Sequence, residues 1–167
     1  INNTNLVEEA IDMVQYSRAD SVYICTTPDY NMYTPDSTSS LDIIYSQEAV
    51  DNLVNTGIDS NYTATYYPWI LTRDTVNNTQ IYLPPTGEVC RNLALTDNIS
   101  FPWFASAGYT RGLVNSIKAR QKLTQTDRDT LYQDRINPIA TFSDVGTVIW
   151  GNKTLQVADT ALNRLNV

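Results

Sequence analysis

A helical pattern followed at once by an apolar, strand-like run constrains the fold of this chain more than any other feature. Apolar residues recur at helical spacing over residues 5–16, and acidic residues occupy the other face. The run at 21–26, SVYICT, lacks polar alternation, which is typical of a strand covered by helices on both faces. A helix followed by such a strand is half of an α/β repeat. We therefore predict an α/β fold with a mixed sheet flanked by helices.

The rest of the chain continues this alternation. The patterns predict further helices over 41–55, after the turn Pro84-Pro85-Thr86-Gly87, and over 127–135 with Thr126 as its N-cap. They predict strands near 64–72, 80–83, 139–142 and 147–150. Pro68 should bulge the first of these strands or confine it to a sheet edge. Residues 27–40 have the composition of a surface loop.

The length of 167 residues suits one domain with its own core, so we expect residues 1–167 to form one domain. The chain lacks a starting Met and ends abruptly, and we expect it to be a piece of a longer chain. No apolar run approaches the roughly 18 residues of a membrane span, so we expect no membrane partner. Cys25 and Cys90 lie in apolar segments far apart, which favours two buried thiols over a disulfide.

Charge is distributed unevenly along the chain. The net charge of -7 argues against a protein that binds nucleic-acid phosphates directly. Residues 1–72 contain ten acidic side chains and one base, whereas 111–135 contain six bases and three acids. Each segment could be only a solvated surface. Alternatively, the acidic region of one copy of the chain could bind the basic region of another copy, head to tail. The residues predicted for such a subunit interface are Arg111, Lys118, Arg120, Lys122, Arg128, Asp36 and Asp42.

Catalytic and metal-binding patterns are missing from the sequence. The chain contains no histidine, so it cannot form a Ser-His-Asp or Cys-His arrangement. The two distant cysteines do not suggest a metal site, and neither a calcium-loop pattern nor a glycine-rich phosphate loop appears. We therefore predict no catalytic residue, metal or cofactor. Asp127 and Asp129 could act as an acid/base pair, but a helix cap explains them better.

Three tryptophans leave a second function class open. Trp69, Trp103 and Trp150, together with eleven tyrosines, could form a sugar-binding platform beside acidic residues. Aromatic side chains in strand-like runs more often pack in a core or at a subunit contact. The alternative is thus a carbohydrate-binding or hydrolytic domain that uses this aromatic surface.

An ordered set of short motifs in the second half resembles the tail sheath protein of contractile-tailed bacteriophages, a family that also includes the sheaths of contractile bacteriocins. No single motif is specific, but their order is. The motifs are Tyr67-Pro68-Trp69, Pro84-Pro85-Thr86-Gly87, Ala94-Leu95-Thr96-Asp97, Ser106-Ala107-Gly108-Tyr109 with Arg111-Gly112, Ile136-Asn137-Pro138-Ile139, Trp150-Gly151-Asn152-Lys153-Thr154 and Arg164-Leu165-Asn166-Val167.

The resemblance implies a subtilisin-like sheath domain that lacks a catalytic triad and is not an enzyme. It implies a structural subunit that polymerises around the inner tail tube and contracts to drive genome ejection. The implied partners are other sheath subunits in hexameric rings, the inner tail tube protein, the baseplate and the tail terminator. The implied location is the tail sheath of the virion, assembled in the host bacterial cytoplasm. A contractile bacteriocin or another phage-derived injection sheath remains an alternative within the class.

Overall fold

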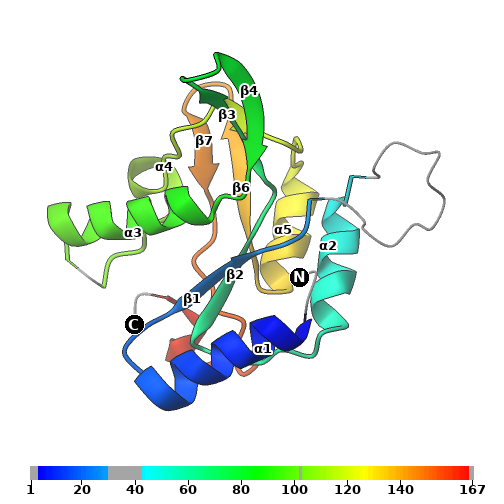
Figure 1. Ribbon diagram of the computed structural model, residues 1–167, viewed down its shortest axis with the longest axis vertical. Coiled ribbons are helices and arrows are strands. Elements are labelled where there is room, and N and C mark those ends of the chain that lie inside the picture. The colour runs from blue at the N-terminus through cyan, green and yellow to red at the C-terminus, as the bar shows by residue number, and fades with distance from the viewer. Residues whose placement is uncertain (1–3, 30–42, 102, 166–167) are drawn as a thin grey trace.

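The computed structural model describes residues 4–29, 43–101 and 103–165, and its strands and helices interleave along the chain (Figure 1). Among the described residues, four strands form what we call the mixed sheet, in the order β1-β2-β6-β7. β1, β2 and β6 run parallel, and β7 runs antiparallel to β6. Their bounds are β1 Tyr23–Thr26, β2 Thr63–Tyr67, β6 Ile136–Phe142 and β7 Gly146–Ile149. The predicted α/β fold with a mixed sheet is confirmed.

A smaller antiparallel sheet joins β4 (Thr79–Leu83), β3 (Ile70–Asp74) and β5 (Lys118–Ala119), in that order among the described residues. The prediction of one strand over 64–72 is wrong, because β2 ends at Tyr67 and β3 belongs to this second sheet. Pro68 separates them after a cis peptide bond, and it has no amide hydrogen with which to continue a strand ladder. The predicted strand at 80–83 corresponds to β4, which is exposed along its whole length.

Among the described residues, the four longer helices occupy the positions that the apolar patterns indicated, with shifted ends, and the two shortest helical segments were not predicted. Their bounds are α1 Thr4–Asp12 with its π-helical continuation η1 Met13–Arg18, α2 Ser46–Val54, α3 Thr86–Ile99, α4 Gly108–Arg111, α5 Gln125–Gln133 and the 3-10 turn η2 Ala161–Asn163. The helix predicted over 41–55 begins only at Ser46, and positions 41 and 42 lie outside the described residues. The N-cap of α5 is Thr124 rather than Thr126, because Thr124 Oγ1 accepts a hydrogen bond from the amide of Asp127.

Two apolar cores cover opposite faces of the mixed sheet. Neighbouring residues of a strand point to opposite faces, so Tyr67 joins one core and Tyr66 joins the other. The first core receives side chains from α1, α2 and α5, namely Ile11, Ala49, Val50, Leu53 and Leu131. The second core receives Val89 of α3, with Leu93 packed against it. The sheet therefore has helices on both faces, as the run at 21–26 predicted.

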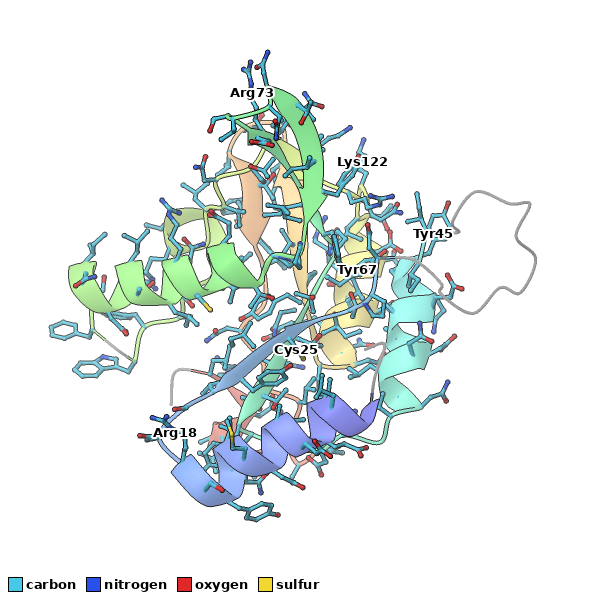
Figure 2. The ribbon with its side chains drawn as sticks, viewed as in Figure 1. Arg18, Cys25, Tyr45, Tyr67, Arg73 and Lys122 are labelled. Atoms are coloured by element: carbon cyan, nitrogen blue, oxygen red, sulfur yellow. The ribbon has the colours of Figure 1, made fainter. Side chains whose placement is uncertain are left out.

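The two cysteines differ in exposure. Cys25 is buried in β1, and its Sγ lies 3.5 Å from the carbonyl oxygen of Ala64. Figure 2 shows Cys25 and Tyr67 inside the molecule and Arg73 at the tip of the antiparallel sheet. Both thiols are free, which confirms the absence of a disulfide between them, but Cys90 is exposed. The prediction that Cys90 is buried is wrong, because Cys90 follows Val89 on α3 and so points away from the core that Val89 enters.

Asn137 links the parallel strands to the segment after β7 through three hydrogen bonds. Its Nδ2 donates to the carbonyl oxygens of Thr65, at 3.1 Å, and of Lys153, at 2.8 Å. Its Oδ1 accepts from the amide of Lys153 at 2.6 Å. A Cβ atom on Gly151 would lie 2.6 Å from that Oδ1, so this position has no room for a side chain. Two of the motifs behind the family resemblance thus meet at this one buried amide.

Candidate functional site

The predicted interface cations fall into different environments. Lys118 in β5 and Lys122, four residues later, are both exposed. Figure 2 shows Lys122 near the antiparallel sheet. Asp36 and Asp42, the predicted acidic contacts, lie outside the described residues. Of the predicted set, Lys118 and Lys122 are therefore the exposed cations within the part of the chain that the structure describes.

Arg120 forms an ion pair inside the molecule. Its Nη1 lies 3.0 Å from Oδ2 of Asp29, and the two side chains are only 8% and 5% exposed. The guanidinium carbon also lies 4.1 Å from the centre of the Tyr82 ring. Burial raises the pKa of the Asp29 carboxyl, and the nearby guanidinium opposes that shift. Arg120 thus connects β4 and the segment after β5 to the loop after β1. Sequence reasoning missed this pair because Asp29 is far away in the chain.

Arg111 and Arg128 are partly exposed and lie against aromatic rings. Arg111 donates from Nε to the carbonyl oxygen of Ala105 at 2.9 Å, and its guanidinium lies 4.7 Å from the centre of the Phe104 ring. Arg128 donates to the carbonyl oxygen of Leu123 at 3.1 Å and lies 5.3 Å from the ring of Phe142. Both arginines therefore have local structural roles, and both side chains remain partly exposed.

The carboxyl group of Asp127 caps a helix. Its Oδ2 accepts hydrogen bonds from the hydroxyl of Thr124, at 2.7 Å, and from the amide of Thr124, at 2.9 Å. Its Oδ1 accepts from the hydroxyl of Ser46 at 2.9 Å, which ties α5 to α2. These hydrogen bonds lower the pKa of Asp127, with the Thr124 hydroxyl as the largest cause. The capping explanation is confirmed for Asp127.

The three tryptophans lie in three different environments. Trp69 donates from its ring nitrogen to the carbonyl oxygen of Thr27 at 3.0 Å. Trp150 packs against Tyr109, with ring centres 5.1 Å apart in an edge-to-face arrangement. Trp103 is 61% exposed and stacks on Phe101 with ring centres 4.7 Å apart. A hydrogen bond accounts for Trp69, and packing accounts for part of the Trp150 ring, which is 37% exposed. Trp103 lies at the surface, as the alternative of an exposed aromatic surface expected.

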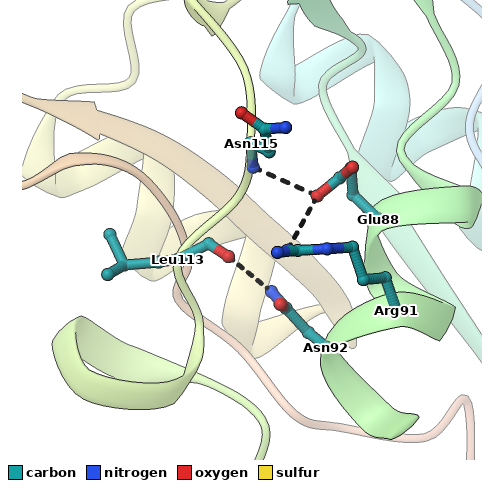
Figure 3. A network of polar contacts seen from close by, with 5 residues as sticks. All are labelled: Glu88, Arg91, Asn92, Leu113 and Asn115. Carbon is teal, nitrogen blue, oxygen red and sulfur yellow. Dashed lines mark hydrogen bonds and ion pairs between the residues drawn. The ribbon is translucent and has the colours of Figure 1, made fainter. Parts of the chain in front are cut away.

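A groove of about 280 Å³ lies between α3, α4 and the segment after α4. Figure 3 shows how side chains of α3 hold this segment. Asn92 donates to the carbonyl oxygen of Leu113 at 2.9 Å. Glu88 accepts a hydrogen bond from the amide of Asn115 at 3.1 Å and forms an ion pair with Arg91 at 3.4 Å. The groove itself is lined by Arg91, Asn92, Leu95, Thr96, Ile99, Ser100, Thr110, Arg111 and Leu113.

Sequence reasoning identified Arg111 but missed the rest of this groove. The signal was present, since Arg91, Leu95 and Ile99 recur every four residues on one side of α3. The described residues contain no group of three or more His, Cys, Asp or Glu side chains that could hold a metal ion. Within those residues there is also no helix that is long and apolar enough to cross a membrane.

Known proteins with similar sequences are sheath proteins of phage tails. The chain is 34% identical to the tail sheath protein of Vibrio phage KVP40 over 134 residues, which cover 77% of this chain and 19% of that protein. It is 28% identical to the tail sheath protein of Enterobacteria phage T4, over 100% of this chain and 26% of that protein. The chain therefore spans about a fifth to a quarter of the length of these relatives. No family profile matches it.

A solved structure supports the same relationship. The sheath complex of an extracellular contractile injection system called PVC, in its contracted state, superposes with a TM-score of 0.60 and 25% identity. The superposition covers 84% of this chain and 34% of that one. Sequence and fold agree with the resemblance that the ordered motifs indicated. The chain belongs to the tail sheath protein family of contractile-tailed bacteriophages.

Proposed function

We propose that this chain is the core domain of a longer sheath subunit, which polymerises around an inner tail tube and contracts to drive genome ejection. The observation that supports this proposal best is the 34% identity to a phage tail sheath protein over 77% of the chain. The role is structural rather than catalytic. Contraction would exchange one set of subunit contacts for a more stable set, so the free energy for the movement would be stored in the extended assembly.

The proposed partners follow from this role. They are other sheath subunits in hexameric rings, the inner tail tube protein, the baseplate and the tail terminator. The proposed location is the tail of the virion, after assembly in the cytoplasm of a bacterial host. The likeness to an injection-system sheath supports an alternative within the same class, in which the tube delivers something other than a genome. The higher identity to phage proteins favours the phage assignment.

Ionic contacts between subunits are part of the proposal. The exposed ammonium groups of Lys118 and Lys122 would pair with the acidic first part of a neighbour, which includes Asp36 and Asp42. Arg111 and Arg128 would add charge beside their aromatic partners. Exposed ion pairs are individually weak, so such contacts could break and form again as subunits slide.

Electron microscopy of the complete protein that carries this chain tests the proposal. The protein is purified alone at several ionic strengths, imaged in negative stain, and then imaged after coexpression with the inner tail tube protein of the same particle. Rings or striated tubes are expected, with fewer at high salt because the Debye length shortens to about 3 Å at 1 M. A monomer under every condition, with or without the tube protein, would contradict the proposed function.

The ionic contacts need a separate comparison. Reversing both lysines, Lys118→Glu with Lys122→Glu, should weaken assembly and reduce its salt dependence. Arg73→Glu is the matched control, because Arg73 is an exposed cation at the tip of the antiparallel sheet. Unchanged assembly of the double variant would refute the contribution of these two residues.

A further inference from the structure

The groove between α3 and α4 combines an apolar lining with two cations. Leu95, Ile99 and Leu113 are exposed in or beside it, and Arg91 and Arg111 contribute guanidinium groups. Its volume of about 280 Å³ is below the roughly 300–1,000 Å³ of small-molecule sites. A groove of this size suits one or two inserted side chains from a protein surface better than it suits a small ligand.

Both cations of the groove retain donors for a carboxylate. Arg91 forms one ion pair through Nη1 with Glu88, and Arg111 forms one hydrogen bond through Nε with Ala105. A guanidinium has five N–H donors, so one such contact leaves most of them available to a partner. The groove should therefore favour a partner in which apolar side chains are bordered by carboxylates.

The outer side of α1 and η1, which we call the acidic helix face, has this chemistry. Met13 and Tyr16 are 55% and 77% exposed there, although they are among the largest apolar side chains of the segment. Glu9 and Asp12 are also exposed, and Glu9, Asp12 and Met13 fall on one side because residues three and four apart are neighbours on an α-helix. Tyr16 follows in the π-helical η1, where it lines the same surface hollow as Asp12. The inner side carries Ile11 and Val14, which are buried.

The groove and the acidic helix face lie on opposite sides of the mixed sheet. α1 contributes Ile11 to one core, and α3 contributes Val89 to the other. In Figure 1, α1 and α3 are separate helices with the strand β1 between them. Two different surfaces on opposite sides cannot meet within one molecule, but they can meet between copies.

We propose that the groove receives the acidic helix face of a second copy of this chain. Met13 and Tyr16 of one copy would contact Leu95 and Ile99 of the next, and the carboxylates of Glu9 and Asp12 would approach Arg91 and Arg111. Such a contact joins two different surfaces, so it is heterologous, and it repeats without closing unless the rotation closes a ring. This inference rests on the proposed sheath function and assigns one of the contacts by which subunits would join.

Cysteine crosslinking in the complete protein tests this contact. The background is Cys90→Ser, which removes the exposed thiol of α3, and the test variant adds Tyr16→Cys and Ile99→Cys. If the two surfaces meet, mild oxidation should give a ladder of trimers and longer multimers on a non-reducing gel. Exposed cysteines elsewhere in the complete protein are changed to serine as well, so that each single variant has one exposed thiol per subunit and should give no species beyond a dimer.

A control pair separates this contact from random collision. Tyr16→Cys with Val76→Cys uses an equally exposed position at the turn between β3 and β4, and it should give no ladder. An equal ladder from the control pair would overturn the proposal, as would no ladder from the test pair in samples that contain tubes. In the latter case the proposed sheath function would stand, whereas a failure to assemble at all would refute both.

A charge exchange provides a second readout. Glu9→Arg or Arg91→Glu alone should raise the protein concentration needed for assembly by about tenfold, and the two together in one chain should largely restore it. Restoration is expected because every heterologous contact then contains a reversed but still opposite pair. Additive damage in the double variant would argue against the pairing.

Discussion

Asn137→Ala is the substitution that tests the structure most directly. The side chain of Asn137 is 0% exposed and makes three hydrogen bonds, all to backbone groups. Alanine would remove these bonds and leave the carbonyl oxygens of Thr65 and Lys153 and the amide of Lys153 without this partner. The substitution acts at the junction between β2, β6 and the segment after β7, so its effect should be global rather than local.

The magnitude follows from the number of bonds. A buried hydrogen bond contributes about 0.5–1.5 kcal/mol to the free energy of unfolding, and a buried polar group left without a partner lowers it by about 1–3 kcal/mol. One bond to the buried Thr65 and two to the partly buried Lys153 give an expected loss of about 3–5 kcal/mol, which is large beside a typical unfolding free energy of about 5–15 kcal/mol. For a domain of this length, that loss corresponds to a decrease in Tm of about 6–20 °C.

Urea unfolding followed by tryptophan fluorescence and circular dichroism measures the loss. The matched control is Asn98→Ala, which removes one exposed hydrogen bond to the carbonyl oxygen of Ala94 and should change the unfolding free energy by less than about 0.5 kcal/mol. If the two variants lost similar amounts, or if Asn137→Ala lost less than about 1 kcal/mol, the role assigned to Asn137 would be wrong.

Three further predictions concern other residues. Arg120→Met should destabilise the fold by about 3–5 kcal/mol because it leaves the buried carboxylate of Asp29 without its cation, and adding Asp29→Leu should recover part of that loss in urea unfolding. In the native state Cys90, which is exposed, should react quickly with a thiol reagent, whereas Cys25 should react only after unfolding, because burial both blocks access to its thiol and raises the pKa of that thiol. Equal labelling rates of the two cysteines, measured by mass spectrometry, would contradict this prediction. Asp127 has a lowered pKa in the fold, so its stabilisation is present above its unfolded pKa of about 4 and is lost as pH falls through its folded pKa. The stability difference between the wild type and Asp127→Asn should therefore shrink as pH falls from about 5 to 2, and a constant difference would refute the capping role.

Local patterns in the sequence were enough to indicate the α/β layout. The run at 21–26 lies on β1, and the helical pattern over 5–16 lies on α1 and its continuation. Periodic burial depends on residues three or four apart, which a sequence displays directly. The same patterns were weaker at the ends of elements, where capping decides the boundary. Thr126 looked like an N-cap, but Thr124 occupies that position because its hydroxyl meets the amide of Asp127.

The sequence by itself thus determined the fold class, the family and the uneven charge, because each is carried by neighbouring residues or by the order of motifs. Only the tertiary structure decided which charged residues are internal and which distant segments of the chain lie side by side. Arg120 pairs with Asp29, β2 and β3 separate into two sheets at Pro68, and Arg91 joins Arg111 in one groove. All three depend on the relative placement of segments far apart in the chain, and a local pattern carries no information about that placement.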